Sequence, residues 1–236
     1  MPLHLLSDGS TFAYSNVEKP KICYLHGWGR DSKDFKNIME FFPGIAVDLP
    51  GFGKTKNLNQ SLDPSEYAIY LNNILPPEIT TVVGHSFGGR VAVHLSLLRN
   101  IQNLVLIAVP LLLNKQNTNG FNKLSILKYL SKFGLVSNKT IESTKNKVGS
   151  FDYRNSQGIM RDTLVKAVND DLTKKLELID SNVNLIWGED DTEVPVSVAI
   201  QAKDLFKNSK LTIIPNQGHN ILRSNSQSIS EVLSKL

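Results

Sequence analysis

The segment 80–98 constrains the fold of this chain more than any other. Residues 80–83 form a short apolar run, Gly84-His85-Ser86-Phe87-Gly88 follows, and residues 89–98 have the pattern of a helix. A G-x-S-x-G sequence between a strand and a helix is typical of a turn so sharp that the serine is strained and its hydroxyl is exposed. The same residues could also form an ordinary glycine-rich turn. The pattern therefore predicts an α/β chain in which Ser86 is a candidate nucleophile.

Two later strand ends carry the groups that a serine nucleophile needs. Residues 184–187 form an apolar strand pattern that ends at Gly188, and residues 211–214 form another that is soon followed by His219. A neutral imidazole can take the serine proton during attack, and a carboxylate can hold the imidazole in the right tautomer. The carboxyl ends of parallel strands meet at one edge of a sheet, so we expect these groups to meet Ser86 there. The candidates for the acid are Glu189, Asp190, Asp191 and Glu193.

An early glycine-rich loop is the candidate oxyanion hole. Residues 21–25 have the pattern of a buried strand and lead into His26-Gly27-Trp28-Gly29. In acyl transfer the carbonyl oxygen becomes an anion, and losing one N–H group that stabilises it costs roughly 2.7–4 kcal/mol. We expect the backbone N–H groups of Trp28 and Phe87 to serve here. The substrate pocket, whose aromatic walls would suit an apolar acyl group, is predicted to be lined by His26, Gly27, Trp28 and Phe87.

Five motifs together resemble the α/β-hydrolase family. In chain order they are His26-Gly27-Trp28-Gly29, Asp48-Leu49-Pro50-Gly51-Phe52-Gly53, Gly84-His85-Ser86-Phe87-Gly88-Gly89, Gly188-Glu189-Asp190-Asp191 with Val194-Pro195, and Gly218-His219. The resemblance implies a mostly parallel central sheet flanked by helices, with an inserted helical cap. It also implies a covalent acyl-enzyme and neither a metal nor an organic cofactor.

The resemblance also selects one acid and one kind of chemistry. The order Gly188, two residues, Asp191, two residues, Val194-Pro195 fits the family pattern, so Asp191 is the predicted acid. Epoxide and haloalkane hydrolases of the family carry an aspartate where this chain has Ser86. Acyl chemistry is therefore the first expectation.

We expect one α/β-hydrolase core, residues 1–109 and 182–236, interrupted by a helical cap at residues 110–181. Strand patterns alternate with helical patterns in the core, which favours a parallel sheet. In the family an insertion at this point covers the nucleophile, so substrate specificity is expected in the cap. Its apolar residues recur at helical spacing: Leu124, Leu127, Leu130 and Phe133, then Met160, Leu164, Val168 and Leu172. The expected core helices are residues 34–42, 64–75, 88–98, 196–206 and 226–236.

Composition narrows the class of protein further. The chain has 236 residues, enough for one large α/β domain, and no apolar run approaches the 18 or so residues of a membrane span. We see no secretory signal, and the single cysteine, Cys23, forbids an internal disulfide, so a cytoplasmic enzyme is expected. The net charge of +4 is mild, and no motif supports nucleic-acid binding.

Positive charge is concentrated in the predicted cap. It is either a solvated surface or a docking face, because clustered charge steers encounter with an oppositely charged partner. The loop at residues 26–29 is similar to that of the pimeloyl-carrier-protein methyl esterases, which place basic cap residues against an acidic carrier protein. An acidic acyl carrier protein is therefore a candidate partner. Residues 110–150 contain one acidic residue, Glu142, and seven lysines: Lys115, Lys123, Lys128, Lys132, Lys139, Lys145 and Lys147.

The sequence thus predicts a serine hydrolase, most simply a carboxylesterase that cleaves small or medium acyl esters through Ser86, His219 and Asp191. A thioesterase, a C–C bond hydrolase or a lyase of the same fold would use the same residues and stays an alternative. A binding protein that keeps the fold without turnover is an alternative of a different class.

Overall fold

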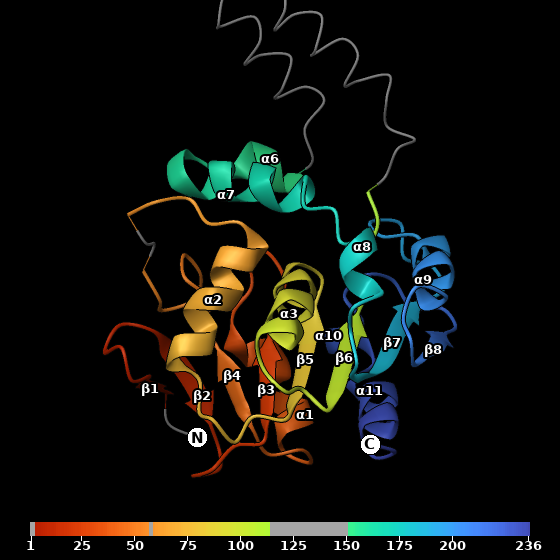
Figure 1. Cartoon of the computed structure of the whole chain (residues 1–236), viewed down its shortest axis with the longest axis horizontal. Coiled ribbons are helices and arrows are strands. Elements are labelled where there is room, and N and C mark those ends of the chain that lie inside the picture. The colour runs from red at the N-terminus through yellow and green to blue at the C-terminus, as the bar shows by residue number, and fades with distance from the viewer. Residues whose placement is uncertain (1–2, 57–58, 114–150) are drawn as a thin grey trace, which may run out of the picture.

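The computed structural model describes residues 3–56, 59–113 and 151–236, which form a sheet flanked by helices (Figure 1). In these residues the sheet has eight strands in the order β1-β2-β4-β3-β5-β6-β7-β8. Strand β2 pairs antiparallel with β1 and β4, and all other pairs are parallel. The strands are β1 (Leu3–Leu5), β2 (Phe12–Ser15), β3 (Ile22–Leu25), β4 (Ile45–Val47), β5 (Thr81–His85), β6 (Asn103–Ile107), β7 (Asn182–Gly188) and β8 (Ser209–Ile214).

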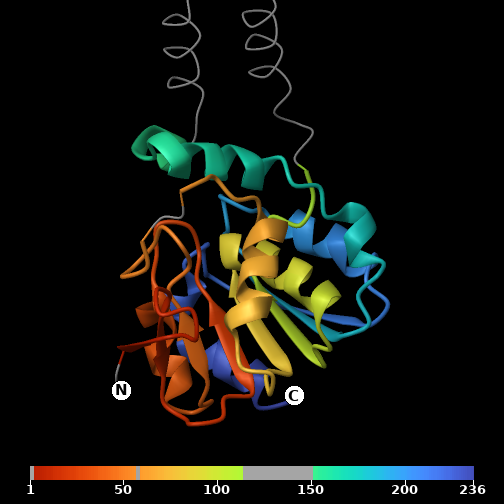
Figure 2. The same ribbon diagram turned by 60° about the vertical axis from the view of Figure 1, so that its left-hand side comes forward.

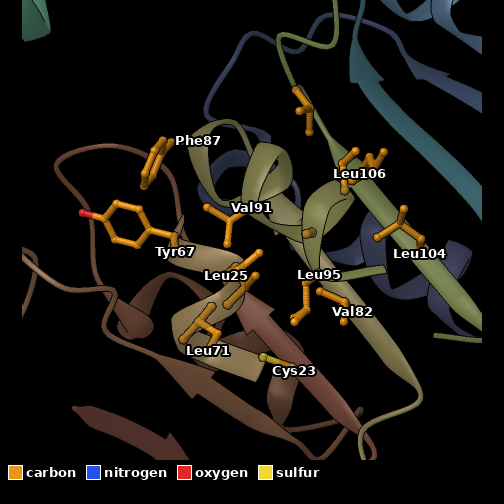
Figure 3. Close-up of a cluster of buried hydrophobic side chains, with 14 of the residues drawn as sticks. Cys23, Leu25, Tyr67, Leu71, Val82, Phe87, Val91, Leu95, Leu104 and Leu106 are labelled. Carbon is orange, nitrogen blue, oxygen red and sulfur yellow. The ribbon is translucent and has the colours of Figure 1, made fainter. Parts of the chain in front are cut away.

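Helices cover both faces of the sheet because successive strand residues point to opposite sides. In β5, Val82 packs into one apolar cluster and Val83 into the other. Figure 3 shows part of the first cluster, in which Leu95 of α3 lies beside Val82 and Val91 lies next to Leu25. The first cluster is covered by α2 (Pro64–Ile74), α3 (Phe87–Leu98), α8 (Thr173–Leu176) and α9 (Val196–Lys203). The second is covered by α1 (Lys36–Met39), α10 (Ile221–Ser224) and α11 (Ser226–Leu233).

This arrangement confirms the predicted α/β fold with a mostly parallel sheet, while one helix differs from its prediction. The helix expected at residues 34–42 is a 3-10 helix, η1 (Ser32–Phe35), followed by the short α1. The Asp31 side chain accepts a hydrogen bond from the Lys33 N–H and caps this tight first turn. Apolar spacing alone does not distinguish these two kinds of helix.

Two helices lie over the end of the sheet at which β5 leads into α3 (Figures 1 and 2). They are α6 (Phe151–Asn155) and α7 (Gly158–Val168). Helix α7 is tied to the segment before α2, because Thr163 Oγ1 accepts a hydrogen bond from the Leu62 N–H at 3.3 Å and Lys166 Nζ donates to the Ser61 carbonyl at 2.7 Å. Of the predicted helical period, Met160, Leu164 and Val168 lie in α7. Leu172 does not continue this helix, because α7 ends at Val168 and Leu172 is the N-cap of α8.

Part of the predicted insertion lies outside the described residues. This applies to the apolar repeat at residues 124–133 and to all seven lysines of residues 110–150. Within the described ranges, every helix is too short or too polar to cross a lipid bilayer.

Candidate active site

Ser86 occupies the sharp turn between β5 and α3. Its φ of 49° and ψ of −112° lie outside the usual regions for a residue with a side chain, as the sequence predicted for this position. The turn needs glycine on both sides. A Cβ at Gly88 would lie 2.3 Å from the Leu25 carbonyl oxygen, and one at Gly84 would lie 2.6 Å from the Cα of Gly89. The strained turn therefore presents the Ser86 hydroxyl to the cleft described below.

A chain of hydrogen bonds joins Ser86 to a histidine and a carboxylate. Ser86 Oγ lies 3.0 Å from His219 Nε2, and His219 Nδ1 lies 2.8 Å from Asp191 Oδ2. The other carboxylate oxygen, Oδ1, accepts the backbone N–H groups of Glu193 at 2.9 Å and Val194 at 2.8 Å. A carboxylate held in this way requires the proton on His219 Nδ1, which leaves Nε2 free to accept from Ser86.

The register of the sheet brings together the loop after β7, which carries Asp191, and the loop after β8, which carries His219. Gly188 at the end of β7 pairs with Ile214 at the end of β8. The loops then continue side by side, since the Glu189 N–H donates to the Ile214 carbonyl at 3.0 Å and the Asp190 N–H donates to the Gln217 backbone carbonyl at 2.9 Å. Parallel pairing thus positions a residue three beyond Gly188 next to a residue five beyond Ile214.

Of the four carboxylates in the loop after β7, Asp191 alone accepts a hydrogen bond from His219 in the described residues. Its side chain is fully buried. Glu193 is exposed, although its Oε2 lies 3.8 Å from His219 Nε2. Burial and the nearby Glu193 carboxylate raise the pKa of Asp152, which comes from α6. Two acids therefore flank the open side of the imidazole, in addition to Asp191 behind it.

His85 stabilises the loop that carries His219. Its Nε2 lies 3.0 Å from the His219 carbonyl oxygen, to which it donates. Its Nδ1 is buried without a hydrogen-bond partner in the described residues. Burial lowers the pKa of His85 to about 4, and the neighbouring His219 adds to this effect. The ring is therefore neutral near pH 7 and acts as a donor to the backbone that carries His219.

The loop after β3 meets the start of α3. Gly29 has a φ of +67°, and the Arg30 N–H donates to the Gly27 carbonyl at 3.3 Å, which closes the turn. The Trp28 and Phe87 rings meet edge to face with centroids 5.2 Å apart, and the Phe52 ring packs against both. An aromatic wall thus stands next to Ser86.

The four predicted pocket residues divide into two groups. Gly27, Trp28 and Phe87 line the cleft. His26 does not line it, in contrast to the prediction, because its side chain is fully buried beneath the loop. Its Nε2 accepts from the Leu49 N–H at 3.0 Å, and its Nδ1 donates to the Gly27 carbonyl at 2.8 Å. His26 therefore supports the loop instead of facing a ligand.

The cleft above Ser86 has a volume of about 1160 Å³. Its floor contains Ser86 and His219, and its α7 wall contains the apolar residues Met160 and Leu164. Arg90 also lines it and was not among the predicted site residues, although its position four residues after Ser86 on a predicted helix could have suggested a shared face. Within the described ranges, no group of three or more His, Cys, Asp or Glu side chains is arranged to hold a metal ion.

The chain is similar in sequence and in fold to known proteins. Over 227 residues the chain is 29% identical to a pimeloyl-[acyl-carrier protein] methyl ester esterase of Pseudoalteromonas atlantica, with 85% of this chain and 87% of that protein covered. A thermophilic esterase superposes with a TM-score of 0.72 at 21% identity, over 99% of this chain and 97% of that one. MenH from S. aureus superposes with a TM-score of 0.66 at 21% identity, over 96% and 97%. Residues 24–231 match the model of the alpha/beta hydrolase family, and the chain belongs to that family.

Proposed function

We propose that this protein is a serine hydrolase that cleaves carboxylic esters, with Ser86 as nucleophile, His219 as general base and acid, and Asp191 as the group that orients His219. The observation that carries the proposal is the continuous hydrogen-bond chain from Ser86 Oγ through the imidazole to the buried carboxylate. A serine on a surface turn has no need of such partners. Together they are what a serine needs to attack a carbonyl near neutral pH.

The proposed reaction has two halves. Ser86 Oγ attacks the ester carbonyl while His219 Nε2 takes its proton, and the backbone N–H groups of Trp28 and Phe87 stabilise the resulting oxyanion. The intermediate then collapses to an acyl-enzyme, and His219 returns the proton to the departing alcohol. A water molecule, deprotonated by His219, attacks the acyl-enzyme in the same way. Ser86 regains its proton and the carboxylic acid leaves.

The substrates we propose are esters with small or medium acyl groups. The aromatic wall of Trp28 and Phe87 and the apolar side chains of α7 suit an aliphatic chain. We further propose that residues 110–181 form the cap of an α/β-hydrolase core, because α6 and the cleft-facing side of α7 supply part of the cleft wall.

A methyl ester carried on an acyl carrier protein is a second candidate substrate. It is favoured by the similarity, over most of both chains, to a protein named pimeloyl-[acyl-carrier protein] methyl ester esterase. This candidate would be rejected if the carrier-protein ester were hydrolysed no faster than the free small methyl ester.

Hydrolysis of a series of p-nitrophenyl esters, from acetate to laurate, tests the proposal. We expect turnover to peak at one chain length and to vanish in Ser86→Ala. The matched control is Ser96→Ala, which removes a hydroxyl from α3, the helix that Ser86 precedes; among the described residues the Ser96 hydroxyl bonds only to the Val93 carbonyl. If the folded wild-type protein turns over no ester, a thioesterase, a C–C bond hydrolase, a lyase or a non-catalytic binding protein would replace the esterase.

A further inference from the structure

Charged side chains are unevenly distributed around the cleft. Glu193 and Asp152 lie on the side of His219. The two cleft-lining arginines of the described residues are Arg30 and Arg90. Arg30 is paired, since its guanidinium donates to the Asp34 carboxylate at 2.7 Å. Arg90 makes no ion pair with any described residue, so it is the cation of the cleft whose charge is not matched by a carboxylate contact.

Arg90 is buried, which makes the missing partner significant. The residue is 5% exposed and lies one turn of α3 beyond Ser86, whose carbonyl oxygen accepts its backbone N–H. Its guanidinium makes one hydrogen bond in the described residues, from Nη1 to the Asp170 carbonyl oxygen at 2.7 Å. A guanidinium has five N–H donors, and a buried charge is costly unless it is paired. Most of the hydrogen-bonding capacity of Arg90 is therefore available.

The two carboxylates whose charges act on Arg90, those of Asp170 and Asp171, are already engaged elsewhere. Asp171 Oδ1 accepts hydrogen bonds from the Thr173 N–H at 3.1 Å and from the Thr173 hydroxyl at 2.7 Å. Asp170 Oδ2 lies 2.8 Å from His94 Nε2, and its Oδ1 accepts from Lys175 Nζ at 3.1 Å. Arg90 contacts only the backbone of Asp170. Burial lowers the pKa of Arg90 to about 10, so the side chain is still cationic near pH 7. The wall between α3 and α7 thus combines this cation with the apolar residues Leu164 and Ala167.

We propose that Arg90 binds a carboxylate carried by the substrate, so that the preferred substrates are half-esters of aliphatic dicarboxylic acids. This inference rests on the proposed esterase function and names its substrate class. A planar guanidinium matches a carboxylate in a two-point contact, and a methylene chain suits the apolar wall. The Cα atoms of Ser86 and Arg90 are about 6 Å apart along a helix, so ester and carboxylate can occupy one cleft.

The two acidic side chains beside His219 favour the same orientation of the substrate as Arg90 does. A substrate carboxylate placed near Glu193 and Asp152 would meet like charge, whereas at Arg90 it would meet opposite charge. The two effects together favour the pose in which the ester lies at Ser86 and the free carboxylate lies toward α7. The reverse pose would place the ester away from the nucleophile and would not react.

The test is a comparison of matched substrates. Monomethyl esters of the dicarboxylic acids from glutarate to azelate are each paired with the ester in which a carboxamide replaces the free carboxylate. We expect kcat/KM for the acid to exceed that for the amide by about tenfold or more at the best chain length. In Arg90→Gln the ratio should fall close to one, and in Arg90→Lys it should be intermediate, because the charge stays but the two-point contact is lost.

Arg99→Gln is the matched control. Arg99 follows the same helix and donates to one backbone carbonyl, that of Pro76, but it does not line the cleft. Its substitution should leave the ratio within about twofold, and thermal melting shows whether each variant is folded. A purely structural role of Arg90 would change the melting temperature without changing the ratio. If Arg90→Gln does not fold, the wild-type ratio and the Arg90→Lys ratio decide.

The outcomes separate the two proposals. A wild-type ratio near one, or a ratio that survives in folded Arg90→Gln, overturns the role of Arg90 and leaves the esterase intact. If no ester is turned over, the esterase proposal fails, and calorimetric titration of Ser86→Ala with the same half-ester and its amide still measures carboxylate binding. Equal affinities for the two ligands would then overturn the inference about Arg90 independently of turnover.

Discussion

The replacement Asp191→Asn tests the proposed catalytic chain most directly, because the structure predicts which way the new amide will point. Asp191 Oδ1 accepts two backbone N–H groups, from Glu193 and Val194, and an amide nitrogen cannot accept them. The asparagine oxygen must therefore remain on that side. Its NH₂ group then replaces Oδ2 opposite His219 Nδ1.

This orientation forces the wrong tautomer on His219. With an N–H donor facing it, Nδ1 must act as acceptor, so the proton moves to Nε2 and points at Ser86 Oγ, 3.0 Å away. Nε2 can then no longer accept the serine proton. The corresponding change in a serine protease lowers kcat about 10⁴-fold, and at 1.36 kcal/mol per factor of ten this is about 5.4 kcal/mol. We expect a loss of this order here, with backbone contacts and fold retained.

Steady-state hydrolysis of the best p-nitrophenyl ester near pH 7 measures the effect. Asp190→Asn is the control, because it makes the same chemical change one residue away on an exposed side chain. It should keep activity within about twofold. Asp191→Asn activity within tenfold of the wild type, or an equal loss in the two variants, would refute the assignment of Asp191 and would direct attention to Glu193.

Two further predictions concern stability. A Cβ at Gly88 would lie 2.3 Å from the Leu25 carbonyl oxygen, so Gly88→Ala should lower the unfolding free energy by about 1–3 kcal/mol or more. In the control Gly218→Ala the nearest neighbour of the new Cβ would be 3.9 Å away, so this free energy should change little. Equal melting temperatures of the two variants would contradict the packing argument. Because burial lowers the pKa of His85 from 6.5 to about 4, the unfolded chain binds a proton in this window that the folded chain does not, and stability should fall by up to about 3 kcal/mol as the pH drops through it. Denaturant titrations should show a shallower fall in His85→Phe, and an unchanged slope would exclude His85 as the cause.

Some features of this protein follow from local sequence. The glycines on both sides of Ser86 and the alternation of strand and helix patterns are properties of neighbouring residues, and they predicted the strained turn and the mostly parallel sheet. Local spacing was a weaker guide to the helix expected at residues 34–42. There the cap at Asp31 favours a 3-10 turn that apolar periodicity does not reveal.

The physical difference between neighbouring side chains lies in the tertiary structure. Residue types and strand ends did not distinguish the four acids of one loop, and Asp191 was selected only through the family pattern. In the structure Asp191 hydrogen-bonds to His219 because pairing of β7 with β8 aligns the two loops. Likewise, His26 belongs to a motif but is turned beneath the loop by its bonds to backbone groups.

The sequence by itself thus determined the fold class and the order of the candidate catalytic residues, since both depend on patterns within short segments. Only the tertiary structure decided which side chains face the cleft. Arg90 is one more polar residue on a helix until α7 and the turn after it enclose it, and its burial without a carboxylate partner exists only in that enclosure. The physical reason is that charge pairing and burial depend on segments distant in the chain, here residues 90 and 170, whose proximity no local pattern encodes.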